Sequence, residues 1–239
     1  MVGKITDLGN KRELNEDYLD YFKCKDFEVY VIADGMGGHN AGEVASKMAV
    51  EGILNFIKSN YGIINNEEIL KKSVEFVNDK IYKHSLSSKS LEGMGTTLTA
   101  CFRTKKELQI ANVGDSSCLA IKDDKIEKIT KDHSLVQELL DSGSITEEEA
   151  KIHPIKNIIT RAIGTNSTVN IDIYNYCPKE YDTFILCTDG LTNDVSITEI
   201  LEAVKSTSDY NKVCRSLVDL AKLRGGKDNI SVLIFGGEM

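Results

Sequence analysis

The stretch VYVIADGMGGH, residues 29–39, joins an apolar run to an Asp-Gly dipeptide and a glycine-rich loop. A similar junction occurs downstream, where the apolar run 184–188 leads into Asp189-Gly190. Short apolar runs rich in β-branched and aromatic residues predict buried strands, and Asp-Gly favours a turn. Asp34 and Asp189 are therefore both expected at the ends of strands.

Asp228 stands in the opposite order, because it precedes its apolar run at 230–235 instead of following it. If that last strand is antiparallel to the other two, all three carboxylates meet at one end of a sheet. Clustered carboxylates repel one another unless protons or cations neutralise them. Oxygen ligands without sulfur or clustered histidine suit Mg²⁺ or Mn²⁺. A single Asp-Gly ordinarily makes only a turn, so the positions of the three aspartates carry this prediction.

Size and composition restrict the class of protein. The chain has 239 residues, 41% of them hydrophobic and 28% charged, which is typical of a globular protein, and we expect a single domain at 1–239. The net charge of −8 disfavours a nucleic-acid or anionic membrane partner. No apolar run has the length of a signal peptide or a membrane span, and the six cysteines contain no Cys-x-x-Cys pair. A cytoplasmic protein with reduced cysteines is expected.

The hydrophobic period alternates between about two and about 3.6 along the chain and predicts both strands and helices. Amphipathic helices are expected at 41–58, 66–84, 196–205 and 209–224. Strands are expected at 4–9, 18–24, 29–33, 95–103, 108–113, 117–121, 125–129, 169–177, 183–188 and 230–235. Because strands flank one early and one late pair of helices, we predict an α+β fold, a four-layer αββα sandwich of two mainly antiparallel β-sheets flanked by helices.

The segment 131–165 has a different texture, because short helical patterns replace strands there. One short helix should end at Gly143, and Ser144 has capping-box spacing to Glu147 for a second. Loop-like insertions on a rigid scaffold often face the substrate. We therefore expect 131–165 to be a flap that influences substrate choice.

Six motifs occur in order along the chain and resemble those of the metal-dependent type 2C Ser/Thr protein phosphatases in their bacterial form. The likeness extends over essentially the whole chain and implies a hydrolase that removes phosphate from phosphoserine and phosphothreonine. The motifs are RELNED at 12–17, ADGMGGH at 33–39, GMGTT at 93–97, NVGDS at 112–116, CTDGL at 187–191 and KDNI at 227–230.

The resemblance implies a core of two Mn²⁺ or Mg²⁺ ions. In that family the residue matching Asp34 bridges the two metals, and the carbonyl matching Gly35 completes the second. The residues matching Asp189 and Asp228 hold the first. Two such cations can share a bridging water that attacks a phosphate monoester, so no protein nucleophile is needed. The absence of a Cys-x₅-Arg pattern agrees with this mechanism.

The resemblance also implies supporting roles around the two metals. Glu16 and Asp17 would orient waters, and Asp115 would join Asp189 at a third, weaker metal. Arg12 would hold the substrate phosphate, for which a planar guanidinium with paired donors is suited.

The proton donor for the leaving alkoxide stays open. Animal members of the family have a histidine directly after the Asp-Gly, but Met36 stands there in this chain. His39 or a water on the metal is the candidate acid. The other three histidines are not expected to act in catalysis, and Arg161 is expected to form an ion pair beneath the 131–165 segment.

Two alternatives remain beside the phosphatase. One is a catalytically silent relative that acts as a phosphoprotein-binding module. The other is a nucleotide-binding fold in which residues 35–38 cradle phosphates, but a following Lys and any Gly-x-Gly-x-x-Gly are missing. By analogy with bacterial relatives, the expected partners are phosphorylated proteins, including a Ser/Thr kinase and its targets, and we expect a monomer.

Overall fold

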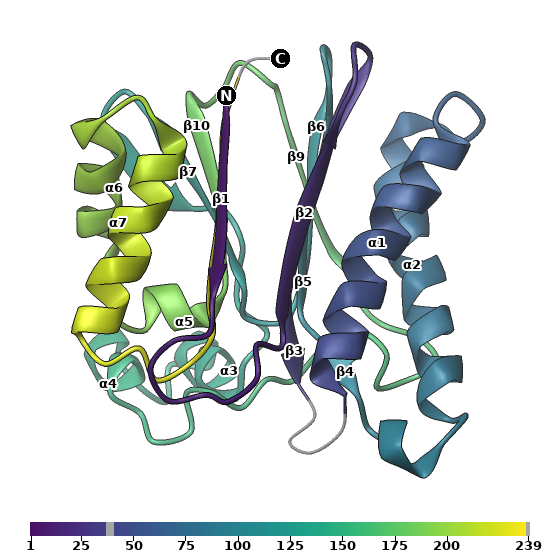
Figure 1. The fold of residues 1–239 in the computed structure, drawn as a ribbon, viewed down its shortest axis with the longest axis horizontal. Helices are drawn as coiled ribbons and strands as arrows, with labels where there is room; N and C mark the ends of the chain where they lie inside the picture. Colours follow the sequence, from purple (N-terminus) through teal and green to yellow (C-terminus); the bar gives the residue numbers. More distant parts are fainter. Residues whose placement is uncertain (37–40, 238–239) are drawn as a thin grey trace.

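Two antiparallel β-sheets lie face to face in the computed structural model, which describes residues 1–36 and 41–237. Helices cover the outer face of each sheet, as Figure 1 shows. The predicted four-layer αββα sandwich is confirmed. The first sheet has the order β1 (Val2–Asp7), β11 (Ile230–Gly236), β10 (Thr183–Cys187), β7 (Ser117–Lys122) and β8 (Lys125–Lys128). The second has the order β2 (Asp17–Lys23), β3 (Phe27–Met36), β5 (Leu98–Thr104), β6 (Leu108–Val113) and β9 (Asp172–Tyr176), and β4 (Gly95–Thr96) pairs with β3.

The two long early helices cover the second sheet, and the two late helices cover the first (Figure 1). The early pair is α1 (Gly42–Asn60) and α2 (Asn66–Ser85), and the late pair is α6 (Ile197–Ser206) and α7 (Tyr210–Leu223). The late pair begins with a capping box at Ser196 and Glu199. Shorter helices are η1 (Lys89–Leu91), α3 (Leu135–Asp141), α4 (Glu147–Lys151) and α5 (Asp189–Thr192).

Strand β3 shows why the molecule has apolar layers on both sides of each sheet. Side chains of a strand alternate between its two faces. Val29 and Val31 belong to the apolar cluster shared with α1 and α2, whereas Tyr30 and Ile32 belong to the cluster between the sheets. In that middle layer the Tyr30 ring stacks on Phe235 of β11 with centroids 3.7 Å apart. The near-continuous apolar run at 29–33 is therefore buried on both faces.

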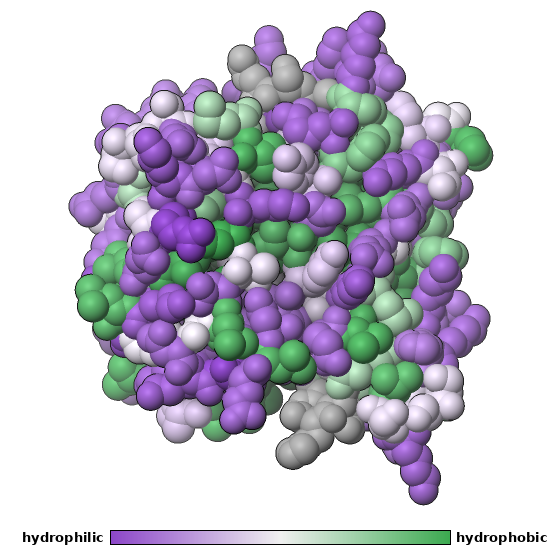
Figure 2. Space-filling view, viewed as in Figure 1, coloured by the Kyte–Doolittle hydropathy of each residue, from purple (hydrophilic) through white to green (hydrophobic). Residues whose placement is uncertain are grey.

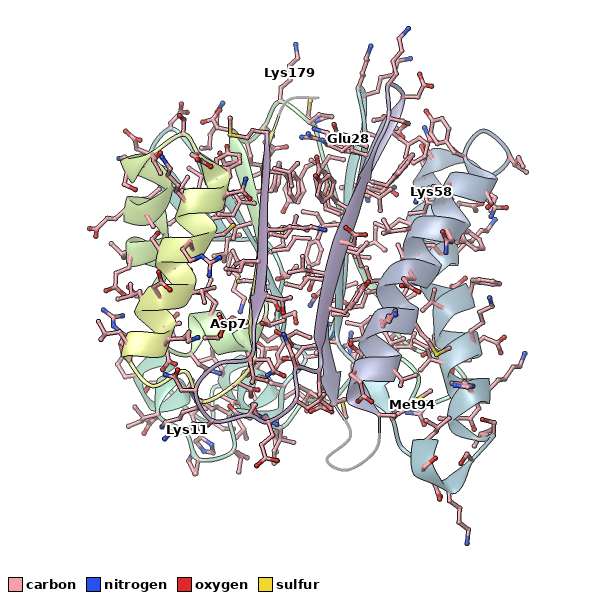
Figure 3. All side chains as sticks on the ribbon, in the orientation of Figure 1. Asp7, Lys11, Glu28, Lys58, Met94 and Lys179 are labelled. Carbon is pink, nitrogen blue, oxygen red and sulfur yellow. The ribbon has the colours of Figure 1, made fainter. Side chains whose placement is uncertain are left out.

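A buried ion pair within the second sheet, at the end of the sandwich away from the β1–β2 loop, supports a contact with the first sheet. Arg103 and Glu28 are 1% and 3% exposed and pair side chain to side chain. Arg103 also donates to the carbonyl of Gly236 in the opposite sheet. Figure 3 shows Glu28 and Lys11, which lies in the β1–β2 loop, at opposite ends of the molecule. The loops that carry the aspartates therefore lie at the end of the sandwich opposite this ion pair.

Three local predictions were wrong. Asp34-Gly35 does not make a turn after β3, because the strand continues to Met36 and Gly35 pairs with Thr96 of β4. Asp189 is the first residue of α5 rather than part of a turn. The capping box of the second helix in the 131–165 segment joins Thr146 to Glu149, two residues later than expected, because those residues satisfy each other's backbone groups.

The molecular surface is mainly hydrophilic on the visible face, with smaller hydrophobic areas among the polar residues (Figure 2). Within residues 1–36 and 41–237, none of the helices combines the length and apolar character needed to cross a lipid bilayer.

Candidate active site

Those predicted site residues that the structure describes come together at one end of the sandwich, from both sheets rather than from one. Strand β3, which carries Asp34, belongs to the second sheet, whereas β10 and β11 belong to the first. Strands β10 and β11 are antiparallel, so Asp189 follows one strand and Asp228 precedes the other at the same end. The expectation that one sheet carries all three aspartates was wrong. Asp34 reaches Asp189 and Asp228 because the two sheets lie face to face.

Asp17 and Asp34 are direct partners in the antiparallel β2–β3 pair. Partners in such a pair place their side chains on the same face of the sheet. Asp17 is buried, and its Oδ2 accepts a hydrogen bond from Thr188 Oγ1 at 2.9 Å. Thr188 caps α5, so this bond ties the second sheet to the first beside Asp189.

The backbone of Asp34 is held by two threonines of the GMGTT motif. Thr97 Oγ1 accepts from the Asp34 N–H at 2.9 Å, and Thr96 Oγ1 donates to the Asp34 carbonyl at 2.8 Å. The Asp34 side chain senses the charge of Asp189, which is among the causes that raise the pKa of Asp34. Sequence reasoning assigned no role to these threonines, although their motif was part of the resemblance.

Arg12 lies against the acidic cluster. Its Nη2 donates to Asp228 Oδ2 at 2.8 Å, and its Nη1 is 3.9 Å from Glu16 Oε2. The Arg12 side chain is 48% exposed, so its outer donors can reach a ligand from solvent. The hydrogen bond to Asp228 raises the pKa of Arg12.

Asn229 holds the loop that carries these groups. Its Nδ2 donates to the carbonyls of Leu8 and Leu14 at 3.0 and 3.1 Å, and its Oδ1 accepts from the Glu16 N–H at 2.8 Å. Since Asn229 is 3% exposed, these bonds satisfy a buried amide and fix the β1–β2 loop beside Asp228. At the level of sequence this residue was named only as part of the KDNI motif.

Asp115 stands in the β6–β7 turn and is fixed on both sides. The preceding Gly114 has φ +105°, and its N–H donates to His133 Nδ1 at 3.1 Å. The following Ser116 exchanges a hydroxyl hydrogen bond with Thr97 at 2.7 Å. His133 is buried, contrary to its polar sequence neighbourhood, and supports this turn. No local signal could have found it, because its partner is 19 residues away.

The cluster is electrostatically strained without cations. Burial first, and then the charges of the neighbouring aspartates, hold the pKa of Asp34 well above its usual range. Burial raises the pKa of Asp17 to about 7 and, with the charge of Asp189, that of Asp115 to about 8. Burial and the charge of Asp228 also raise the pKa of Asp189. Such a group of carboxyls favours either bound protons or bound cations.

The donor set fits hard divalent cations. Two buried carboxylate oxygens, Asp17 Oδ1 and Asp189 Oδ1, have no hydrogen-bond partner among the residues that the structure describes. Free carboxylate oxygens are the ligands that Mg²⁺ and Mn²⁺ prefer. Over the same described ranges, no three His, Cys, Asp or Glu side chains are grouped so as to hold one ion by themselves. An ion here would therefore keep several waters, as Mg²⁺ usually does.

Glycines permit the close approach of the segments that form the cluster. A Cβ on Gly190 would lie 1.9 Å from the Asn229 carbonyl oxygen, and one on Gly35 would lie 2.2 Å from the Gly42 carbonyl oxygen. Both contacts are with backbone, so neither can be relieved by rotating a side chain. The Asp-Gly dipeptides thus serve backbone contact at this site rather than turn formation.

Two further predictions concern residues near the site. His39 lies outside the described residues. Arg161 forms the expected ion pair, with its Nη1 2.9 Å from Asp172 Oδ1, and the same carboxylate approaches His133 Nε2 at 3.2 Å.

A cavity of about 690 Å³ lies beside the cluster, between the 131–165 segment and the α5–α6 region. Asp115 and Asp189 line its inner side, Val136 and Leu140 of α3 line one wall, and Ile197 lines the other. The cavity is therefore continuous with the carboxylates and is partly apolar.

Comparisons with known proteins agree with this geometry. The family model described as protein phosphatase 2C matches residues 10–222. The serine/threonine phosphatase stp of Listeria welshimeri is 41% identical over 233 residues, which cover 96% of this chain and 92% of the relative. The solved structure of serine/threonine phosphatase Stp1 from Staphylococcus aureus is 35% identical, with a TM-score of 0.88 over 98% of this chain and 93% of that one. The catalytic domain of PstP, solved in complex with two manganese ions, is 32% identical, with a TM-score of 0.84 over 98% and 96%.

The four-layer αββα sandwich, the carboxylate cluster and these matches together place the chain among the phosphoprotein phosphatases. The chain belongs to the protein phosphatase 2C family. It is a serine/threonine protein phosphatase, as its sequence motifs imply.

Proposed function

We propose that this chain hydrolyses phosphoserine and phosphothreonine monoesters with two Mn²⁺ or Mg²⁺ ions held at the carboxylate cluster. Asp34 would bridge the ions, the Gly35 carbonyl would complete one site, and Asp189 and Asp228 would complete the other. The observation that carries the proposal is the meeting of Asp34 and Asp189 in a cluster where their pKa values are raised. The manganese ions in PstP support the choice of metal.

The chain's own residues would do two things around the ions. When bound, the two ions supply a nucleophilic water and neutralise charge on the phosphoryl oxygens. Glu16 and Asp17 accept hydrogen bonds from waters at the site and fix their direction. Arg12 turns a free part of its guanidinium toward the substrate phosphate, where paired donors match two phosphate oxygens. Most of the rate enhancement would come from positioning and charge.

A third, weaker ion would lie between Asp115 and Asp189. Both residues line the same cavity, and the charge of Asp189 is among the causes that raise the pKa of Asp115. Such mutual repulsion is relieved when a cation lies between two carboxylates.

The proton for the leaving alkoxide would come from His39 or from a water at the site. The two sources can be separated with His39→Gln. An alkoxide leaving group needs a proton, whereas p-nitrophenolate leaves without one. Loss of activity on a phosphopeptide with p-nitrophenyl phosphate hydrolysis retained would identify His39 as the acid.

The substrates would be phosphorylated proteins, among them a Ser/Thr kinase and its targets. We place the protein in the cytoplasm as a monomeric, single catalytic domain at 1–239, in which residues 131–165 form a flap that influences substrate choice. The cavity between that segment and α5–α6 supports this role, since a peptide next to the phosphoresidue would lie along it.

The proposal is tested with Asp34→Asn and the matched control Asp219→Asn, which changes an exposed aspartate on α7. Mn²⁺ binding by calorimetry and phosphopeptide hydrolysis are measured on the same preparations. Asp34→Asn should lose both the tight Mn²⁺ sites and metal-dependent hydrolysis, and the control should keep them. Full activity of Asp34→Asn, or of the wild type in excess chelator, would reject the mechanism.

A further inference from the structure

The 131–165 segment reaches the carboxylate cluster through one lysine. Lys156 Nζ donates to Asn193 Oδ1 at 2.7 Å, and Asn193 Nδ2 donates to Asp189 Oδ2 at 2.9 Å. Asn193 follows α5 directly and lies four residues after Asp189, so both side chains occupy one face of that turn. The Asn193 amide accepts from Lys156 through its oxygen and donates to Asp189 through its nitrogen. The three side chains therefore form one continuous series of hydrogen bonds.

The chain of hydrogen bonds fixes only one oxygen of Asp189. The other oxygen, Oδ1, is buried and has no partner within residues 1–36 and 41–237. With Oδ2 held by Asn193, Oδ1 is the oxygen left available to bind an ion. All three residues line the same cavity, so the connection crosses the space between the 131–165 segment and α5. Partners of this kind usually orient metal ligands and tune their affinity.

We propose that Lys156 is a positioning residue that, through Asn193, orients the Asp189 carboxylate for its divalent ion and so couples the 131–165 segment to metal binding. This inference rests on the proposed metal site. Coupling between two sites is reciprocal. Removing the lysine therefore weakens metal binding, and metal binding holds the segment more firmly.

The direction of the change in Mn²⁺ affinity distinguishes a positioning role of Lys156 from a purely Coulombic one. Lys156 is a cation near a cation site, so a purely Coulombic role would make Mn²⁺ bind more tightly when the charge is removed. A positioning role makes Mn²⁺ bind more weakly. Lys156→Met removes both charge and donor, whereas Lys156→Arg keeps both. The matched control is Lys131→Met, because Lys131 belongs to the same segment but pairs with Asp141 at 2.7 Å.

The experiment measures Mn²⁺ affinity by calorimetry for the wild type, these variants, Asn193→Ala and the Lys156→Met/Asn193→Ala double variant. We expect Lys156→Met to weaken binding about 10-fold, at the lower end of such effects. Lys156→Arg should recover most of that loss, and Lys131→Met should match the wild type. The double variant should bind no more weakly than Asn193→Ala alone, since the lysine acts through the amide.

A second measurement follows the segment itself. Hydrogen exchange of the amides at 153–158 should slow when Mn²⁺ binds the wild type, and this protection should vanish in Lys156→Met. Tighter or unchanged Mn²⁺ binding by Lys156→Met, or additive losses in the double variant, would overturn the inference while leaving the metal site intact. Failure of the wild type to bind Mn²⁺ would instead reject the proposed function.

Discussion

Asp17 and Asp34 face each other as partners in the β2–β3 ladder, on a shared face at the end of the sandwich. Like charges directly opposite one another destabilise an antiparallel pair. The chain keeps this arrangement although either carboxyl could be an amide without a change of shape. Bound cations would relieve the repulsion between these two carboxylates. Without cations, the stability of the protein should depend on pH.

The metal-free protein should lose stability as pH rises between about 4 and 8. The pKa of Asp17 is raised from 3.8 to about 7, and that of Asp115 to about 8. Between the unfolded and folded pKa values the folded state holds protons that the unfolded chain has released. Stability is then greatest below the unfolded pKa and falls as pH rises through the folded pKa. Urea unfolding in chelator at a series of pH values measures this slope.

Saturating Mn²⁺ should remove most of that fall, because the ion replaces the protons and binds only the folded state. Asp17→Asn should flatten part of the metal-free profile. Stability that increases from pH 4 to 8 in chelator would contradict the prediction.

Removing the Arg12 guanidinium should lower kcat/KM on a phosphopeptide about 10- to 100-fold. A hydrogen bond to a charged group contributes about 1.5–3 kcal/mol, and each 1.4 kcal/mol is a factor of ten. Arg12→Ala should therefore show this loss, and Arg12→Lys should recover only part of it because it lacks the paired donors. Steady-state kinetics provide the test, with the exposed neighbour changed in Lys11→Ala as the control. Equal kinetics for Arg12→Ala and Lys11→Ala would exclude phosphate binding by Arg12.

Asn229→Ala should destabilise the protein by about 2–3 kcal/mol. The change leaves two carbonyls and one N–H of the β1–β2 loop without their partner, and a buried unsatisfied polar group costs about 1–3 kcal/mol. Asn211→Ala, at an exposed position of α7, should stay within about 0.5 kcal/mol of the wild type. Denaturant unfolding compares the two variants. If they have the same midpoint, the loop does not depend on Asn229.

Gly190→Ala should weaken Mn²⁺ binding and lower the thermal midpoint. Its Cβ would lie 1.9 Å from the Asn229 carbonyl oxygen, so α5 must move away from the 228–229 segment and take Asp189 with it. Gly236→Ala is the control, because its Cβ meets only ordinary contacts at 3.9 Å or more. Calorimetric Mn²⁺ titration and thermal unfolding are the measurements. Unchanged metal affinity in Gly190→Ala would show that the close approach does not set the Asp189 position.

Local signals in the sequence were sufficient for most elements. The period of apolar residues gave α1 and α7 to within two residues at each end, because one stripe of each helix must cover a sheet. Local signals failed where a distant segment provided the partner. β3 extends through Asp34 to Met36 because β4, some 60 residues later, pairs with it.

Position along the chain predicted that Asp34, Asp189 and Asp228 could carry the chemistry, and the resemblance of the motifs added Arg12 and Asp115. How these groups meet depends on contacts between segments far apart in the chain. Two facing sheets bring Asp34 to Asp189, and Thr188, His133 and Asn229 hold the segments together through hydrogen bonds to distant partners. Periodicity and capping act over a few residues and so cannot report contacts that join residues up to 221 positions apart.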